Sequence, residues 1–301
     1  MGYSAGCRSF SGAAGRQIKA KSAVKYFLTV NLIIFILMAA FNSCVKQEQE
    51  SEKPLTITEG ILSVGIEIGY PPMEYYDTDG ITPVGFDIEL VNALAEKLGL
   101  QVNFIDTAWE GILAGLNANR FDIAVNITIL PGREERYNFT KPYINTSIAV
   151  AALKDSAVKL EKLEDIAGKR VGYQGGTTAQ YFTEGLRENG IVFTSFSYDK
   201  IINCFDELAL KRIDFIVADN IAAFDYANRQ NQTVRAGKAS PGFEVVWQGP
   251  ADENIGIALK KKNDRLTLAL NNALDELFED GTIQEISQRI FNINIYSPLE
   301  N

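Results

Sequence analysis

The 301-residue sequence contains no histidine, only three cysteines and only two tryptophans. The lack of histidine excludes a Ser-His-Asp triad, a Cys-His nucleophile pair and histidine-based zinc sites. Cys204 would be the sole cysteine in the part of the chain after Cys44, so no intramolecular disulfide is expected there. A buried structural thiol is the expected role of Cys204, within the apolar stretch IINCFDEL. Much of enzyme chemistry is thereby excluded.

Positive charge is also scarce outside the N-terminus. Residues 1–43 hold five of the 29 basic residues and no acid, so the remainder carries 24 basic against 38 acidic residues, a net charge of −14. Nucleic-acid binding requires a basic patch, so an acidic body argues against it. An acidic protein remains suited to small cationic ligands.

The N-terminus has the pattern of a secretion signal. An apolar run over residues 26–41 follows the basic segment and ends in small residues before Cys44. At 16 residues it is shorter than the ~20 that a membrane-spanning helix needs, although an uncleaved anchor is the alternative. A cysteine directly after such a run resembles the bacterial lipoprotein cleavage box, with Phe41 where leucine is usual. Cleavage and lipidation at Cys44 are therefore predicted.

Hydrophobic periodicity predicts an α/β body. Residues 86–98 place apolar side chains on one face of a helix that stops at Gly99. A second short helix is predicted over 109–116, and strands over 61–68, 101–106 and 122–125. This βαβαβ order implies a parallel sheet with helices on both faces.

A second unit of the same kind follows, and the chain then returns toward the first. The expected strands are 169–173, 191–196, 214–219 and 256–259, and the expected helices are one from Ala179 and those over 205–210, 220–230, 264–278 and 282–291. Two such units with a return strand predict two lobes. A cleft between lobes is a favoured site for a small ligand.

Two features suggest an anion site. Arg133 follows a Pro-Gly turn and offers a planar fork of donors to a carboxylate, although a surface arginine is the alternative. Thr177 and Thr178 follow two glycines at a helix start, where free N–H groups and the helix dipole favour an anion. Their alternative role is to cap that helix.

Six motifs in order resemble the extracellular solute-binding proteins of family 3, the receptors of ABC importers for polar amino acids. They are YPPMEYYD at 70–77, GFDIELVNALAEKLGL at 85–100, TILPGREERYNFTKPY at 128–143, GKRVGYQGGTT at 168–178, RIDFIVADN at 212–220 and GTIQEISQRIF at 281–291. The resemblance covers essentially all of residues 57–291. It implies a two-lobed, periplasmic-binding-protein-like type II fold, in which each lobe is a mostly parallel sheet flanked by helices and two crossover strands join the lobes.

The resemblance also implies a set of ligand-binding residues. Arg133 and Thr128 match positions that hold the ligand's α-carboxylate, together with Thr178 and Thr177, and Asp219 matches the acid that binds the α-ammonium. Asp219 has an alternative role as the N-cap of the next helix. The remaining matches surround the side chain of the ligand. Tyr70 and Trp109 match its walls, and Glu67 matches an acid for a cationic or amide group. Gln174 and Asn126 are further lining residues.

The sequence departs from the family's pattern at three places. AVNIT at 124–128 is one residue shorter than usual, Met73 replaces a common phenylalanine, and Ala179 stands where some relatives have a polar contact. The shortened stretch leaves open which backbone groups face the ligand there.

The expected organisation follows. It comprises a signal segment at 1–44 with the lipidated Cys44, a tether at 45–56, lobe 1 at 57–145 and 247–291, lobe 2 at 146–246, and a tail at 292–301. The implied function is a monomeric, lipid-anchored, extracytoplasmic receptor that delivers a free amino acid to a permease, without cofactor or metal and without nucleic acid as a partner. A cyclohexadienyl dehydratase-like enzyme, with Glu67 as a conceivable general acid, and a sensory module remain alternatives.

Overall fold

The computed structural model describes residues 54–235 and 241–291. The predicted signal segment, Cys44, residues 45–53 of the predicted tether and the tail at 292–301 lie outside the described residues. None of the helices in the described part of the chain is long and apolar enough to cross a membrane.

The first lobe is built on a sheet with the strand order β4-β1-β5-β13-β6, in which β7 also pairs with β13. Its parallel strands are β1 (Ile61–Ile66), β4 (Gln101–Asp106) and β5 (Ile123–Thr128). Its antiparallel strands are β13 (Glu253–Lys260), β6 (Tyr137–Phe139) and β7 (Ile144–Thr146). The predicted βαβαβ unit forms the parallel part.

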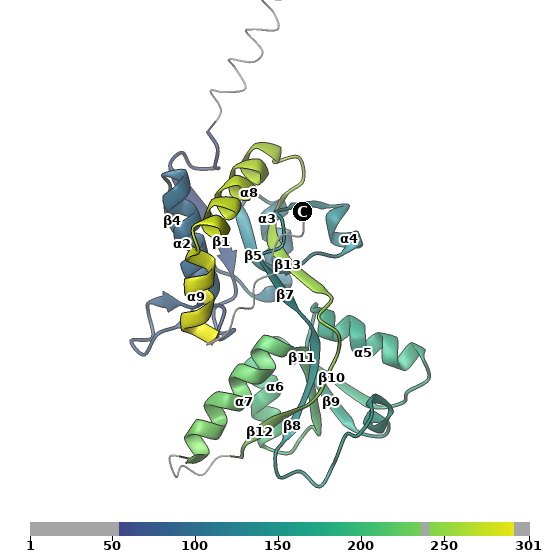
Figure 1. Ribbon diagram of the computed structural model, residues 1–301. Helices are drawn as coiled ribbons and strands as arrows, with labels where there is room; N and C mark the ends of the chain where they lie inside the picture. Colours follow the sequence, from purple (N-terminus) through teal and green to yellow (C-terminus); the bar gives the residue numbers. More distant parts are fainter. Residues whose placement is uncertain (1–53, 236–240, 292–301) are drawn as a thin grey trace, which may run out of the picture. The chain divides into compact units, whose positions relative to one another are not determined.

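Helices cover both faces of this sheet. The helices α2 (Phe86–Leu98), α8 (Asp264–Glu279) and α9 (Thr282–Phe291) pack together over one face (Figure 1). The other face packs against α3 (Trp109–Asn117). The α2 helix has the predicted bounds, because its apolar residues repeat at helical spacing and Gly99 adopts a left-handed conformation (φ 65°) that ends it. A four-residue helix, α4 (Pro131–Glu134), follows β5.

The second lobe has a sheet with the strand order β10-β9-β11-β8-β12. The strands are β8 (Ile148–Leu153), β9 (Arg170–Gln174), β10 (Thr194–Tyr198), β11 (Phe215–Asp219) and β12 (Phe243–Gln248). Strands β9, β10 and β11 are parallel, whereas β8 and β12 run antiparallel to their neighbours. One face packs against α5 (Thr178–Glu188) and the other against α6 (Ile201–Ala209) and α7 (Asn220–Arg235).

The chain passes twice between the two sheets. It leaves the first sheet after β7 and enters the second at β8, and it returns between β12 and β13 (Figure 1). A small hairpin of β2 (Tyr75–Tyr76) and β3 (Pro83–Val84) precedes α2. The fold is therefore α/β with two lobes joined by two crossover strands, as the sequence predicted.

Several predicted boundaries are wrong. The strand expected at 191–196 begins at Thr194, and the helix expected at 205–210 begins at Ile201. Strands β8 and β12 were not predicted from the sequence. All six residues of β8 are buried, and a strand buried on both faces lacks the alternating pattern by which a half-covered strand is recognised.

Candidate functional site

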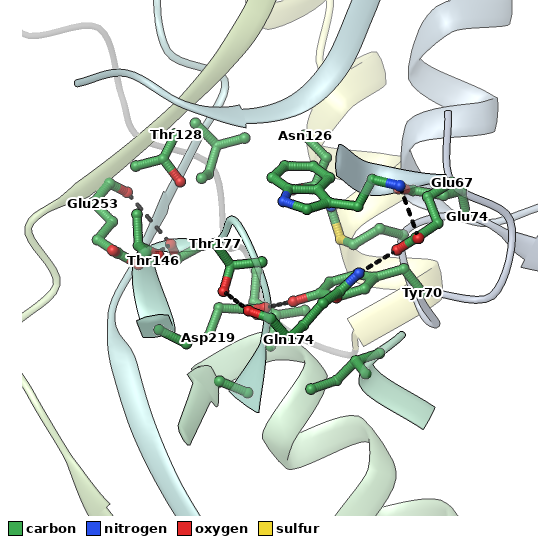
Figure 2. Close-up of a pocket in the computed structure, with 18 of the residues that line it drawn as sticks. Glu67, Tyr70, Glu74, Asn126, Thr128, Thr146, Gln174, Thr177, Asp219 and Glu253 are labelled. Carbon is green, nitrogen blue, oxygen red and sulfur yellow. Dashed lines mark hydrogen bonds between the residues drawn. The ribbon is translucent and has the colours of Figure 1, made fainter. Parts of the chain in front are cut away.

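A pocket is lined by residues of both lobes (Figure 2). Nine of the ten ligand-binding residues predicted from the sequence line it, and they are Glu67, Tyr70, Trp109, Asn126, Thr128, Gln174, Thr177, Thr178 and Asp219. The first five belong to the first lobe and the other four to the second. The tertiary structure thus brings together residues that are up to 152 positions apart in the sequence.

Asp219 caps a helix, as one of the two interpretations predicted, and it also lines the pocket. It ends β11, and its Oδ1 accepts a hydrogen bond from the Ala222 N–H at 2.9 Å, which caps α7. Its Oδ2 accepts a hydrogen bond from the hydroxyl of Tyr70, in the other lobe. Burial raises the pKa of Asp219, while the Tyr70 hydroxyl and backbone N–H groups oppose that rise. Burial, followed by the charge of Asp219, raises the pKa of Tyr70 well above its usual value, so Tyr70 is the donor.

Glu67 is held by hydrogen bonds from both lobes. It follows β1 and is only 3% exposed. Its Oε1 accepts from the Trp109 N–H at 3.0 Å, and its Oε2 accepts from Gln174 Nε2 at 2.6 Å. Burial raises its pKa, and the hydrogen bonds from Gln174 and Trp109 act in the opposite direction. Glu67 is therefore a positioned acceptor in the pocket, rather than a solvated acid at the end of a strand.

The predicted anion site combines a strand end with a helix start. Thr128 ends β5, and Thr177 directly precedes α5, which starts at Thr178. The Thr177 hydroxyl donates to the Gln174 carbonyl at 2.7 Å, so its side chain does not cap the helix. Thr177 and Thr178 both line the pocket, so the positive end of the α5 dipole faces it and favours a negative group there.

Arg133 is the one predicted residue that does not line the pocket. It is 5% exposed, and its guanidinium donates to the Thr128 carbonyl at 3.1 Å and to the Gly176 carbonyl at 3.3 Å. Its Cζ lies 6.0 Å from the centre of the Trp109 ring. Burial lowers its pKa, yet an arginine stays charged in proteins. Arg133 thus lies against the wall that Thr128 and Trp109 form, and it is not the exposed surface residue of the alternative interpretation.

The shortened AVNIT stretch contains an irregularity in the sheet. Between the pairs Ala124–Ala258 and Ile127–Gly256, β5 has two residues where β13 has one. Asn126 is one of these two residues and has a left-handed backbone (φ 57°), which asparagine tolerates better than most residues. This bulge turns Asn126 into the pocket lining.

Three polar residues of the pocket were not predicted from the sequence, and they are Glu74, Thr146 and Glu253. Thr146 and Glu253 pair across the strands β7 and β13, next to the crossovers, and Glu253 also hydrogen-bonds Thr178. Burial raises the pKa of Glu253. The motif YPPMEYYD contained Glu74, but nothing in its spacing separated this acid from its neighbours.

The pocket has a clear electrostatic character. Its lining in the described part of the chain includes the four acids Glu67, Glu74, Asp219 and Glu253 and neither lysine nor arginine. Arg133 contributes positive charge from behind the wall, and the α5 N-terminus contributes it at one side. Such a site suits a small molecule with at least one cationic group and an anionic group placed near α5.

Comparison with known proteins agrees with the fold. The profile of the bacterial extracellular solute-binding proteins, family 3, matches residues 62–293. The chain belongs to this family.

Individual relatives are similar over most of the described chain. The L-cystine-binding protein TcyJ of Escherichia coli (strain K12) is 32% identical over 237 residues, which cover 78% of this chain and 84% of TcyJ. The solved structure of an ancestral arginine-binding protein bound to arginine is 32% identical with a TM-score of 0.71, covering 77% of this chain and 99% of that one. The structure of AncCDT-1, an ancestral amino acid-binding protein and precursor of cyclohexadienyl dehydratase, is 30% identical with a TM-score of 0.65. The match covers 77% of this chain and 95% of AncCDT-1.

Proposed function

We propose that the chain is the amino-acid receptor of an ABC importer and that it prefers a basic amino acid. The observation that carries this proposal is the convergence of nine predicted ligand-binding residues, from both lobes, on one acidic pocket. Relatives named for cystine and for arginine support an amino acid as the ligand. The lining acids Glu67, Asp219 and Glu253 favour a ligand that carries a second cationic group.

Each end of the ligand has a partner. The α-ammonium binds Asp219 in the place of the Tyr70 hydroxyl, and the α-carboxylate binds at Thr128, Thr178 and the α5 N-terminus, with Arg133 drawn forward from the wall. The side chain lies between Tyr70 and Trp109 and ends near Glu67. A ligand that contacts both lobes stabilises the closed form over the open form, which is the signal that a permease recognises.

A thermal-shift screen of the purified protein tests the function. The ligands are the twenty amino acids, ornithine, L-cystine, arogenate and prephenate. With a Kd of about 1 µM, roughly −8 kcal/mol, 1 mM ligand stabilises by about 4 kcal/mol. For a protein of this size we expect a rise in Tm of roughly 8–16 °C. The absence of a shift with every amino acid would contradict the proposal.

Arg133→Ala tests the carboxylate partner. The expected result is loss of the ligand-induced shift, since the carboxylate loses a charge-assisted partner. Arg136→Ala is the matched control, because Arg136 is an exposed arginine of the same turn whose Nε donates to the Gly132 carbonyl at 3.2 Å. A normal shift in Arg133→Ala would refute the role of Arg133.

A dehydratase is the second candidate function. Burial raises the pKa of the pocket acid Glu74 well above its usual value, which favours the protonated form that a general acid needs. Incubation with prephenate and arogenate, followed by chromatography of the products, distinguishes the two functions. We expect neither to be converted, and turnover of either would replace the receptor assignment.

We further propose that the protein is a monomer, anchored outside the cytoplasm by a lipid on Cys44. The N-terminal sequence supports this location, and Cys44 lies outside the described residues. Cys44→Ser is expected to move the protein from the membrane fraction to the soluble fraction of cells. Retention of the variant in the membrane fraction would favour an uncleaved anchor.

A further inference from the structure

Two buried carboxyl groups face one another beside the pocket. Glu74, which lines the pocket, is 3% exposed, and Asp87 in the first turn of α2 is fully buried. The Asp87 N–H donates to the Met73 carbonyl at 3.0 Å, which brings residues 74 and 87 next to each other, and their two carboxyl groups interact. Within the described residues, Glu74 Oε2 and Asp87 Oδ2 have no donor partner. Two ionised carboxylates cannot form a hydrogen bond because both only accept, so this contact requires a proton.

The surroundings determine which of the two acids carries the proton. Asp87 Oδ1 accepts from the Tyr143 hydroxyl at 2.7 Å, and the N-terminal end of α2 also favours a negative charge there. Burial raises the pKa of Asp87 only to about 6. Burial and the charge of Asp87 raise the pKa of Glu74 well above its usual value, and Glu67 adds to that effect. Glu74 is therefore the donor and Asp87 the acceptor.

The pair is connected to the lining of the pocket by hydrogen bonds. The Asn126 side chain hydrogen-bonds Glu74, and the Asn126 N–H donates to the Tyr143 hydroxyl oxygen at 2.8 Å. Tyr143 in turn donates to Asp87, so these four residues form a closed ring. Asn126 is the bulge residue with the left-handed backbone, and a backbone of that kind depends on its surroundings to hold it.

We propose that Glu74 and Asp87 share one proton as an acid pair and that this pair positions Asn126 and the adjoining wall of the pocket. The titratable groups around Glu74 are Asp87, Glu67, Tyr70 and Tyr143. Removal of the proton places a second negative charge in the ring, breaks the contact between the two acids and releases Asn126. The consequence for ligand affinity rests on the proposed function, whereas the existence of the shared proton does not.

Infrared difference spectroscopy of the ligand-free protein at pH 7 tests the proton directly. The spectrum of the Glu74→Gln variant is subtracted from that of the wild type. We expect one protonated-carboxyl band in the difference. Glu96→Gln, an exposed acid on the same α2 helix, should show no such band. A wild type without the band, or a band that persists in Glu74→Gln, would overturn the shared proton.

Unfolding as a function of pH gives a second measurement without ligand. The folded protein holds a proton on Glu74 that the unfolded chain releases above the ordinary glutamate pKa of 4.5. The contribution of Glu74 to stability is therefore full below this pH and declines as the pH rises toward the folded-state pKa. We expect the folding constant of the wild type to fall, relative to Glu74→Gln, by up to about tenfold per pH unit. If the stability of the wild type and of Glu74→Gln changes with pH in parallel, the shared proton is contradicted.

Ligand binding tests the positioning role. Glutamine at position 74 keeps a donor toward Asp87 and cannot ionise, so the affinity of Glu74→Gln for the ligand from the screen should change little as the pH rises above 7. Toward alkaline pH the wild type should lose affinity more steeply than the variant. If the affinity of the wild type and of the variant depends on pH in the same way and the infrared band is present, the shared proton exists but does not position the pocket wall. If no amino acid binds at all, the infrared and unfolding results still decide whether the pair exists.

Discussion

Asp219 shows how one carboxylate can cap a helix and also line the pocket. Its two oxygens point in different directions, with Oδ1 toward the Ala222 N–H and Oδ2 toward the Tyr70 hydroxyl. An asparagine at this position retains a carbonyl oxygen for the helix cap but loses the negative charge. The capping and ligand-binding roles can therefore be separated by a single substitution.

Asp219→Asn is expected to weaken amino-acid binding and leave the fold intact. Loss of a charge-assisted hydrogen bond of about 1.5–3 kcal/mol lowers affinity roughly 10- to 150-fold. Isothermal titration calorimetry measures this change. The control is Asp214→Asn, just before the other end of β11, where Asp214 pairs with Arg170 instead of the pocket. Wild-type affinity in Asp219→Asn would remove Asp219 from the site.

Glu67→Gln tests the preference for a basic side chain. The substitution keeps the size of the side chain and removes its charge, so a cationic ligand loses a charge-assisted partner while a neutral ligand does not. We expect the Kd for arginine, lysine or ornithine to rise about tenfold or more, and that for glutamine to change much less. Glu110→Gln, an exposed acid on α3 beside Trp109, controls for the general effect of lost charge. Equal losses for basic and neutral ligands would show that Glu67 positions Trp109 and Gln174 without reading the ligand's charge.

At the scale of elements, the N-terminus of α2 depends on a glycine. Gly85 precedes the helix with φ 128°, a conformation that residues with a side chain rarely adopt. A Cβ there would lie 2.2 Å from the Met73 carbonyl oxygen, and this carbonyl accepts the Asp87 N–H. The close approach of the two segments fixes Glu74 and Asp87 beside each other.

Gly85→Ala is therefore expected to destabilise the protein by about 2–4 kcal/mol through backbone strain and steric overlap. Urea denaturation followed by circular dichroism measures the change. Gly185→Ala is the matched control, since Gly185 lies inside α5 and an added Cβ would meet nothing within 4 Å. There alanine should stabilise by about 0.5–1 kcal/mol. A Gly85→Ala variant as stable as the wild type would show that the loop can shift.

Whether an element could be predicted from the sequence depended on whether its signals are local. Helices such as α2 and α8 were located well because their apolar spacing and their termini are local signals. Strands β8 and β12 were missed because their position depends on antiparallel pairing with distant segments. For the same reason Glu253 and Thr146, which the crossover strands bring together, were not predicted in the pocket. Arg133 was predicted as a direct lining residue, but the carbonyls that its guanidinium contacts could not be inferred from spacing.

For the molecule as a whole, contacts outside the pocket also join the two lobes. Arg229 on α7 of the second lobe lies over the ring of Tyr75 on β2 of the first lobe, with Cζ 4.9 Å from the ring centre. Asp225 on the same helix pairs with Arg229 and orients it. Lys200 adds another contact between the lobes by donating to the Ile68 carbonyl at 3.1 Å. These interactions exist only while the lobes are together, so they add to the stability of the closed form.

Tyr75→Leu is expected to lower ligand affinity without touching the ligand. The cation–π contact contributes about 0.5–1 kcal/mol to the closed form, so its loss raises the Kd roughly 2- to 5-fold when the free protein is mainly open. Tyr75→Phe keeps the ring and should bind nearly as the wild type does. Titration calorimetry gives the affinities, and small-angle scattering of the free protein gives the proportion that is open. If the free wild type is already closed, the contact has almost no effect on the Kd, because a ligand cannot increase a closed population that is near its maximum. Tyr75→Leu would then bind as tightly as Tyr75→Phe, and the contact between Arg229 and Tyr75 would have no part in ligand capture.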